Sequence, residues 1–305
     1  MKPFPGKEPA LMKKMHLIIN PNAGTRQGRR LLPDFVSAFN RAGYLCTVFC
    51  TEKRGDAAEY ARQQAGDTDL VAVSGGDGTL NEVITGLLQG GLSVPVGYIP
   101  CGSTNDFATG LGLPRQPLKA VQAILEGTPS PLDIGRFGKD RYFTYTASFG
   151  AFTSVSWSTP QNVKNVLGHA AYILEGIRSL ADIRPIHIKI AADGQQYEDD
   201  YLFAAVCNST SLGGVLKLAD HQVDMNDGLF EALLIPFPPD LLVLNQILSA
   251  LTARNYDHPS LRFLRASRFV FEGVPHLKWT LDGEEAEGAS VTEICNLPSA
   301  VTIIR

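Results

Sequence analysis

The sequence has no apolar run long enough to cross a membrane as a helix. Its 305 residues contain no stretch of about 18 uninterrupted apolar residues. The opening segment carries lysines but lacks the apolar core of a signal peptide, so residues 1–15 are assigned as a leader before the first strand. These observations predict a cytoplasmic protein without a transmembrane segment, for which any membrane contact has to be peripheral.

Signatures of a cysteine- or histidine-based metal site and of nucleic-acid binding are also absent. The five cysteines form no Cys-x-x-Cys pair and the six histidines are scattered, which indicates reduced thiols rather than a metal site built on these residues. Charged residues make up 19% of the chain, and the formal net charge is −4. Without a basic excess, we expect no nucleic-acid partner.

The first part of the chain predicts a parallel sheet. Apolar runs typical of buried strands alternate there with helical patterns; the runs are His16–Asn20, Leu45–Thr51, Asp69–Ser74 and Val94–Pro100. Alternation of strands and helices with short links predicts a doubly wound sheet covered on both faces.

The pattern of apolar residues changes after about residue 130. Short runs rich in β-branched and aromatic residues follow; they are Leu132–Phe137, Tyr142–Phe149, Ile186–Ala192, Tyr201–Cys207, Leu229–Ile235, Phe269–Glu272, Leu277–Asp282, Val291–Cys295 and Val301–Ile304. They predict a mostly antiparallel, β-sandwich-like domain, interrupted by helices at 163–180 and 240–252. We therefore assign an α/β protein with one domain at 16–130 and a second at 131–305. Whether the last strand returns to the first domain is left open.

The most informative segment is a glycine-rich turn between a buried strand and a helix. The strand ends at Ser74, and Gly75–Gly78 form the turn. Glycines let backbone N–H groups approach an anion, and a helix N-terminus favours negative charge, so this turn predicts a phosphate-binding loop. Thr79 and Glu82 have the spacing of a capping box. The spacing excludes a Walker loop and the dinucleotide-binding motif.

Two further polar loops follow strands at the same edge of the predicted sheet. Asn20–Gly24 follows the first strand, and Pro100–Phe107 follows the fourth. Each loop alone is equally typical of an ordinary turn or helix cap. Three such loops at the carboxyl ends of parallel strands are typical of a ligand site.

The three loop sequences resemble the catalytic domain of diacylglycerol kinases. The strings NPNAG (Asn20–Gly24), GGDGTLNE (Gly75–Glu82) and GSTNDFA (Gly102–Ala108) have the order and spacing of the bacterial lipid kinase branch, which includes sphingosine-kinase-like proteins. GGDG also occurs in NAD kinases and phosphofructokinases, whereas GSTNDFA narrows the resemblance to lipid kinases. The resemblance implies an ATP-binding first domain and transfer of the γ-phosphate of ATP to the hydroxyl of a diacylglycerol-like or sphingoid lipid, in a cleft between two domains.

The resemblance also implies which residues bind ATP and magnesium. The residues that would bind ATP are Asn20, Gly24, Thr51, Gly75, Gly76, Asp77, Gly78, Thr79, Leu80, Asn81, Gly102 and Ser103. A magnesium ion would be held in the second domain by the carboxylate of Asp227 and the carbonyls of Asp224 and Leu229. From the residues alone, Asn226-Asp227-Gly228 is equally typical of a hairpin turn.

A second acidic string, Asp282-Gly283-Glu284, supplies candidate catalytic carboxylates. A kinase that phosphorylates an alcohol needs a base to accept the hydroxyl proton, and the resemblance implies this role for Glu284. Asp77 and Asp106 would organise metal and water near the γ-phosphate, and Asp282 completes the predicted catalytic set. A hairpin turn explains Asp282 and Gly283 equally well.

The expected partner is a lipid substrate at a membrane surface, with ATP and magnesium as cofactors. Trp157 is a candidate for the edge of an acyl-chain groove. The lipid and the oligomeric state, with a homodimer among the options, are not determined by the sequence. The alternatives are a soluble small-molecule kinase such as an NAD kinase, and a nucleotide-binding sensor without turnover.

Overall fold

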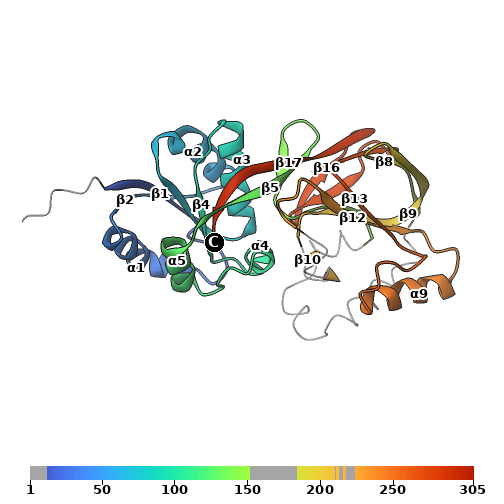
Figure 1. Cartoon of the computed structure of the whole chain (residues 1–305), viewed down its shortest axis with the longest axis horizontal. Coiled ribbons are helices and arrows are strands. Elements are labelled where there is room, and N and C mark those ends of the chain that lie inside the picture. The colour runs from blue at the N-terminus through green and yellow to red at the C-terminus, as the bar shows by residue number, and fades with distance from the viewer. Residues whose placement is uncertain (1–11, 152–183, 210, 213–215, 218–223) are drawn as a thin grey trace, which may run out of the picture. The chain divides into compact units, whose positions relative to one another are not determined.

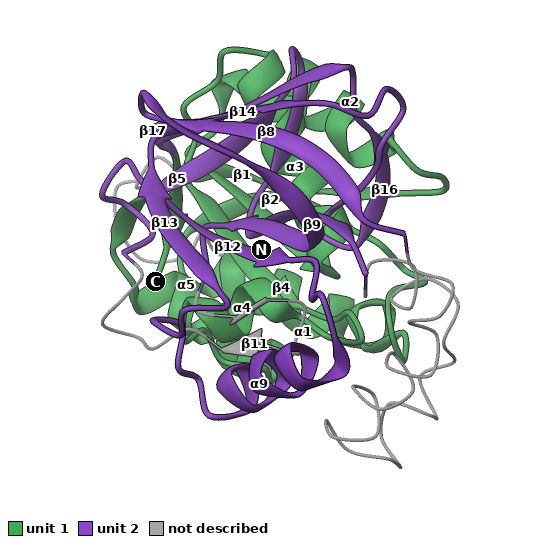
Figure 2. Cartoon of the chain, turned by 90° about the vertical axis from the view of Figure 1, so that its right-hand side faces the viewer, with its two compact units in different colours: residues 1–131, 301–305 green, residues 132–300 purple. Residues whose placement is uncertain are grey.

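The computed structural model describes residues 12–151, 184–209, 211–212, 216–217 and 224–305 (Figure 1). The chain forms two compact units, one up to Pro131 together with Val301–Arg305, the other Leu132–Ala300 (Figure 2). The predicted helix at 163–180 and Trp157 lie outside the described residues. Within the described residues, no helix has the length and apolar character needed to span a membrane.

Unit 1 contains a parallel sheet with the strand order β2-β1-β3-β4. Its strands are β1 (Lys13–Ile19), β2 (Tyr44–Cys50), β3 (Leu70–Gly75) and β4 (Val96–Pro100). Its helices are α1 (Gln27–Arg41), α2 (Asp56–Gln64), the 3-10 turn η1 (Ala65–Asp67), α3 (Asp77–Gln89), α4 (Asp106–Gly110) and α5 (Pro117–Glu126). Helices α1 and α5 cover one face of the sheet, and α2 and α3 cover the other (Figure 1). The predicted doubly wound sheet is confirmed.

The central strand of unit 1 explains why the sheet needs helices on both faces. All six residues of β3 are buried, as expected of a parallel strand covered on both sides. Phe35 and Phe39 of α1 pack with Leu17 and Ile99 from the sheet in one buried cluster. This packing fixes the carboxyl ends of β1, β3 and β4, from which the polar loops leave.

Unit 2 is built of antiparallel pairs, as the sequence predicted. The elements up to residue 236 are β5 (Pro129–Phe137), β6 (Arg141–Phe143), β7 (Thr146–Gly150), β8 (Ile186–Ala192), β9 (Gln195–Cys207), β10 (Ser211–Leu212), β11 (Leu216–Lys217) and β12 (Phe230–Pro236). Those that follow are α9 (Leu241–Thr252), β13 (Arg262–Ala266), β14 (Arg268–Glu272), β15 (Lys278–Leu281), β16 (Glu284–Glu287) and β17 (Val291–Ile304).

The core of unit 2 is centred on one tryptophan. The Trp279 ring makes edge contacts with Phe137, Phe149 and Phe271 at centroid distances of 5.2, 4.7 and 5.0 Å. Such edge-to-face pairs add to the burial of aromatic surface. Trp279 lies on β15, so this packing anchors the hairpin that carries Glu284.

Strand β17 belongs to both units. Its first half pairs antiparallel with β14, and its last part pairs parallel with β4 through Ile303 and Val96. Pro298, which lacks an N–H donor, and Ser299, at φ 50°, separate the two halves. The last residues of the chain therefore complete the sheet of unit 1.

Candidate functional site

The three polar loops of unit 1 touch one another through their backbones. A Cβ atom built on Gly24, which has a φ of +50°, would lie 2.5 Å from the carbonyl oxygen of Cys101. A Cβ on Gly102 would lie 2.5 Å from the Cα of Gly76. Only glycine fits at contacts this close, so these residues allow the loops after β1, β3 and β4 to meet.

Asp77 ties the second loop to the third. It is the first residue of α3 and is 7% exposed. Its carboxylate accepts hydrogen bonds from the backbone N–H groups of Asp106 (2.9 Å) and Phe107 (3.3 Å) and from the Tyr98 hydroxyl (3.3 Å). A carboxylate at the start of α4 is favourable because helix N-termini attract negative charge. These contacts give Asp77 a positioning function, and they place Asp106 beside it.

Asn105 and Tyr98 complete this junction. The sequence placed Asn105 in the third loop without giving it a role, and it did not single out Tyr98. Asn105 has a φ of 53°, and its side chain both accepts from the Gly102 N–H (2.9 Å) and donates to the Gly102 carbonyl (3.1 Å). The Tyr98 hydroxyl also donates to Asn105 (3.3 Å). Burial, followed by the charge of Asp77, raises the pKa of Tyr98, so the hydroxyl keeps its proton. Nothing in the apolar pattern of β4 marks Tyr98.

The predicted capping box at Thr79 and Glu82 is wrong. Helix α3 begins at Asp77, with Gly76 as its N-cap and no side-chain cap. The hydroxyl of Thr79 instead accepts a hydrogen bond from Asn20 (3.3 Å), which joins the first and second loops. Glu82 accepts from the backbone N–H groups of Gly55 (3.0 Å) and Ala57 (3.3 Å), at the start of α2. Thr79 and Glu82 therefore form hydrogen bonds with residues distant in the sequence, in place of the predicted hydrogen bonds within the first turn of α3.

The other predicted ATP-binding residues lie at the same edge of the sheet. Thr51 follows β2, is 8% exposed, and donates its N–H to the Ile19 carbonyl (2.9 Å). Leu80 is buried in α3, Asn81 is half-buried, and Ser103 is exposed. The structure therefore brings all of the predicted ATP-binding residues to the carboxyl ends of adjacent strands.

In unit 2, Asp282 holds a tight hairpin. Asp282 and Gly283 join β15 to β16 with φ values of 49° and 85°, as in a type I′ turn. The Asp282 carboxylate accepts hydrogen bonds from the Thr144 N–H (2.6 Å) and hydroxyl (2.8 Å) and from the N–H groups of Tyr145 and Thr146 (both 3.0 Å). Burial raises the pKa of Asp282, and these hydrogen bonds oppose that shift. They fix the hairpin, while a catalytic role for Asp282 stays a prediction.

The register of β16 separates Glu284 from its acidic neighbours. Glu284 shares a face with the buried Ala286, and Glu284 itself is half-buried. Glu285 and Glu287 alternate to the other face and are exposed, and Glu285 pairs with Lys278 (3.2 Å). Of these carboxylates, Glu284 is the one presented on the inner face of the hairpin.

The predicted magnesium residues lie on the turn before β12. The Asp227 carboxylate accepts from the Leu229 N–H (2.9 Å) and forms an ion pair with Arg265 (2.5 Å). The Leu229 carbonyl accepts from the Asn296 amide (3.1 Å), and the Asp224 carboxylate caps the N–H of Asn226 (3.1 Å).

Carboxylate and carbonyl oxygens are the donors that magnesium prefers. In this turn, however, Arg265 and Asn296 already engage Asp227 and Leu229, so the residues fit the ion only in part. No group of three or more His, Cys, Asp or Glu side chains in the described part of the chain is placed to hold a metal.

A buried carboxylate that the sequence did not single out anchors this turn. Asp133 on β5 is fully buried and accepts hydrogen bonds from the N–H groups of Gly228 and Ser299 (both 2.7 Å) and from Asn296 (3.3 Å). The signal in the sequence is an acidic residue between Leu132 and Ile134, within the otherwise apolar start of this run. Nearby, burial raises the pKa of Glu231 to about 7, and the hydrogen bond from Arg265 opposes that rise.

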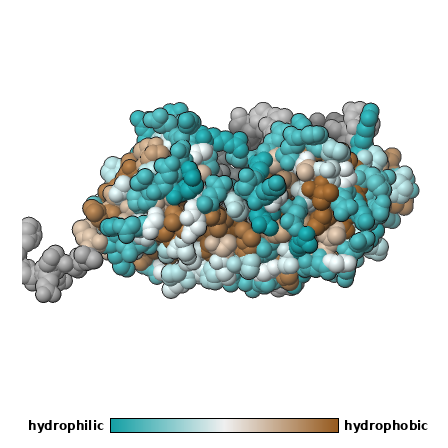
Figure 3. All heavy atoms as spheres, turned by 90° about the horizontal axis from the view of Figure 1, so that it is seen from above, coloured by the Kyte–Doolittle hydropathy of each residue, from teal (hydrophilic) through white to brown (hydrophobic). Residues whose placement is uncertain are grey.

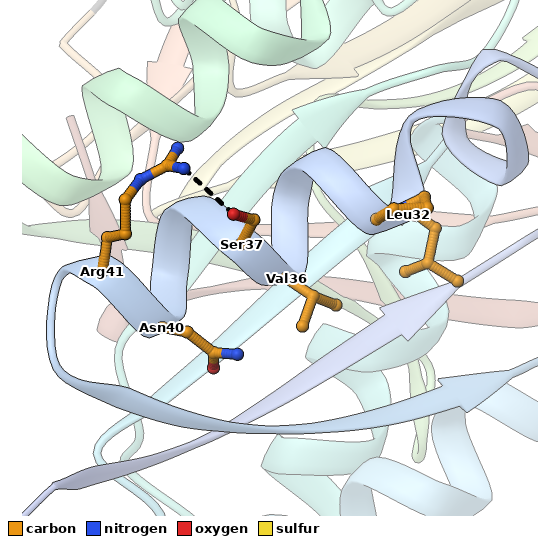
Figure 4. A pocket seen from close by; sticks show the side chains of 6 residues that line it. Leu32, Val36, Ser37, Asn40 and Arg41 are labelled. Carbon is orange, nitrogen blue, oxygen red and sulfur yellow. Dashed lines mark hydrogen bonds between the residues drawn. The ribbon is translucent and has the colours of Figure 1, made fainter.

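A hollow along α1 is separate from these residues. It is lined by Leu32, Pro33, Val36, Ser37, Asn40 and Arg41, with a hydrogen bond from Arg41 to Ser37 (Figure 4). It contains none of the loop residues, so we assign it no part in the site.

Comparison with known proteins supports the resemblance seen in the loops. Residues 14–137 match the diacylglycerol kinase catalytic domain, and residues 148–305 match the YegS C-terminal NAD kinase beta sandwich-like domain. Curated relatives named diacylglycerol kinase include one from Bacillus subtilis (strain 168), 32% identical over 90% of each chain. Another, from Staphylococcus aureus (strain bovine RF122 / ET3-1), is 32% identical over 90% of this chain and 87% of the relative.

A solved structure has the same fold along nearly its whole length. It comes from Bacillus anthracis str. Sterne and is described provisionally as a diacylglycerol kinase. Its TM-score is 0.81 at 26% identity, and the match covers 99% of this chain and 98% of that one.

Proposed function

Because the chain belongs to the diacylglycerol kinase family, it is an ATP-dependent lipid kinase, and we propose that it transfers the γ-phosphate of ATP to the hydroxyl of a diacylglycerol-like or sphingoid lipid. The observation that carries the proposal is the backbone contact between the three loops of unit 1. Gly24 lies against Cys101, and Gly102 lies against Gly76 at the start of α3. Such a helix N-terminus, approached closely by glycine loops, suits a phosphate group.

We assign ATP to unit 1, within the proposed domain 16–130. Asn20, Gly24, Thr51, the run Gly75–Asn81, Gly102 and Ser103 form the proposed binding set. Asp77 acts by holding the third loop through Asp106 and Phe107. Magnesium on the phosphates of ATP would neutralise the charge of the transferring group, and Asp106 is the proposed carboxylate near it. At the turn of Asp224, Asp227 and Leu229, magnesium would compete with Arg265 for Asp227.

The proposed domain 131–305 supplies the base. Glu284 accepts the proton of the lipid hydroxyl as the phosphoryl group is transferred. Its place on the inner face of β16 supports this assignment over Glu285 and Glu287. Asp282 keeps the hairpin in position through its bonds to the 144–146 segment. The lipid is reached by peripheral contact with a membrane surface.

We also propose a homodimer formed through β2. This strand ends the sheet and pairs only with β1 within the described residues. Its sequence, YLCTVFC, has no charge and no proline, the usual protections of an exposed edge. Leu45 is 58% exposed and Val48 is 38% exposed. Figure 3 shows apolar atoms gathered at the end of unit 1 that contains β1 and β2.

An antiparallel pairing of two β2 strands centred on Thr47 is self-complementary. It places Leu45 opposite the partner copy's Phe49 and Cys46 opposite its Val48, with the two Thr47 residues facing each other. Such apolar and Thr–Thr cross-strand pairs are favourable, and no like charges meet.

The test is label transfer from γ-labelled ATP in the presence of magnesium. The acceptors are vesicles that contain diacylglycerol, phosphatidylglycerol, sphingosine or ceramide, and NAD in solution. We expect one lipid to be labelled, and we expect Glu284→Gln to lower the rate by about 10²–10⁴-fold, the usual contribution of a general base.

Glu285→Gln is the matched control because it alters the adjacent carboxylate on the opposite face of the strand. It should keep the wild-type rate. Label in NAD with none in any lipid would reject the proposed acceptor class. A Glu284→Gln enzyme as active as wild type would reject the base assignment.

A further inference from the structure

The guanidinium group of Arg265 occupies the acidic turn before β12. Its Nη2 lies 2.5 Å from the Asp227 carboxylate, and its Nε lies 3.0 Å from the Glu231 carboxylate. One cation therefore joins two carboxylates that come from the turn and from the strand after it. Charge-assisted bonds of this kind are among the strongest in proteins.

The pairing of two strands in the sheet positions Arg265 beside this turn. Strands β12 and β13 pair antiparallel, with Glu231 directly opposite Arg265. The Glu231 side chain is 1% exposed, and its Oε2 atom is buried without a hydrogen-bond partner among the described residues. Burying a charged carboxylate costs free energy unless it is paired. The ion pair with Arg265 therefore offsets the cost of burying Glu231.

Two further oxygens of the turn are engaged by protein donors. The Leu229 carbonyl accepts from Asn296, and the second Asp227 oxygen accepts from the Leu229 N–H. The Asp133 carboxylate accepts a hydrogen bond from the Gly228 N–H. The turn thus has the oxygen donors of a hard-cation site, but a protein cation satisfies its carboxylate.

We infer that Arg265 is a built-in cation that takes the place of a divalent metal ion at the Asp227 turn. The guanidinium and a magnesium ion would compete for the Asp227 carboxylate. Arg265 is tethered by Glu231, so it is present at a far higher local concentration than a dissolved ion. The ion pair therefore stabilises the turn in the absence of metal. Removal of the Arg265 guanidinium converts the turn into a magnesium site. This inference rests on the placement of the turn and not on the identity of the lipid.

The experiment compares the melting temperature of the full chain in EDTA and in excess magnesium, without ATP or lipid. Wild type should show no magnesium-dependent shift. Arg265→Met should melt lower in EDTA and gain roughly 5–10 °C when magnesium reaches about 100 times its Kd. Calorimetric titration of Arg265→Met with magnesium should show one site, which the double variant Arg265→Met/Asp227→Asn lacks.

Arg262→Met is the matched control because Arg262 lies on the same strand and pairs with a different carboxylate, Asp199 (3.2 Å). It should show no magnesium dependence. If Arg265→Met does not fold in EDTA, Arg265→Lys, which keeps the charge but loses the planar fork, takes its place and should show a smaller gain. Equal magnesium stabilisation of wild type and the Arg265 variant would overturn the inference. Absence of any gain in the variant would overturn it too. No kinase assay enters the test, so its outcome is separate from that of the proposed function.

Discussion

At the scale of single residues, the site depends on glycines at positions where backbone atoms of a neighbouring loop leave no space for a Cβ atom. Gly24 and Gly102 meet backbone atoms of neighbouring loops at distances that a Cβ atom cannot occupy. Asp77 and Asp282 act in a related way, because each carboxylate gathers backbone N–H groups from a separate segment. These residues shape the loops on which the proposed chemistry depends.

Gly102→Ala should weaken ATP binding without unfolding the protein. The new Cβ would lie 2.5 Å from the Cα of Gly76, so the second and third loops would have to separate. We expect the Kd for ATP to rise by about tenfold or more, which corresponds to roughly 1.4 kcal/mol. Titration calorimetry measures this effect.

Gly66→Ala is the control for Gly102→Ala. A Cβ at Gly66 would meet only the end of the Leu92 side chain at 3.4 Å, an ordinary contact. It should leave ATP affinity unchanged. An unchanged affinity in Gly102→Ala would show that the contact between the two loops does not shape the ATP site.

At the scale of elements, helix α3 connects the phosphate loop to the rest of unit 1. Its residues Leu80, Val83, Ile84 and Leu87 are buried, and the Glu82 carboxylate accepts hydrogen bonds from two N–H groups at the start of α2. Helix α2 comes close enough to α3 that Gly86 contacts the α2 backbone. Helix α3 is therefore held against α2 by both a carboxylate and a close backbone contact.

Gly86→Ala should destabilise unit 1. A Cβ there would lie 2.1 Å from the carbonyl oxygen of Ala58, which forces α2 and α3 apart. Alanine favours helices, but overpacking against a backbone atom costs about 1–3 kcal/mol and should exceed that gain. The urea unfolding midpoint measures the loss.

Gln89→Ala, at an exposed position near the end of the same helix, is the matched control. Its midpoint should equal that of wild type or exceed it slightly. A Gly86→Ala midpoint as high as that of the control would mean that the two helices are free to move apart at no cost.

At the scale of the whole molecule, the chain passes between its units through strands. Strands β5 and β17 both continue across the boundary near residues 131 and 300, and Ile303 of β17 pairs with Val96. The opposite end of the unit 1 sheet is the uncovered strand β2. The proposed dimer would pair this strand and so remove the exposed edge.

Val48→Lys and Leu45→Lys should make the protein monomeric. In the proposed pairing each lysine would face an apolar side chain of the partner copy, and charges on an edge strand oppose pairing. Size-exclusion chromatography with light scattering should give twice the mass of the chain for wild type and the mass of one chain for each variant.

Leu118→Lys is the control for the dimer. Leu118 is 47% exposed and lies on α5, away from the β2 edge. This variant should stay dimeric. A monomeric wild type, or lysine variants that still dimerise, would reject β2 as the interface.

Much of the fold could be predicted because its signals are local. The strand at Ile186–Ala192 has the predicted bounds, and the strand ending near Ser74 and the helix after it follow from periodicity and glycine placement. The sequence did not predict β13 or β16, because Arg262–Ala266 and Glu284–Glu287 are rich in charge and resemble exposed loops. Pairing with neighbouring strands makes them part of the sheet.

The order of the elements, the glycine loops and the resemblance to lipid kinases could be predicted from the amino-acid sequence, since each depends on a few consecutive residues. Tertiary structure decided which partners the polar groups of those segments take. Asp77 bonds to Asp106 and Phe107, Glu82 bonds to the start of α2 and not within its own helix turn, and Arg265 reaches back to Asp227. A polar side chain can satisfy its hydrogen bonds in many ways, and only packing of segments that are distant in the chain selects one of them.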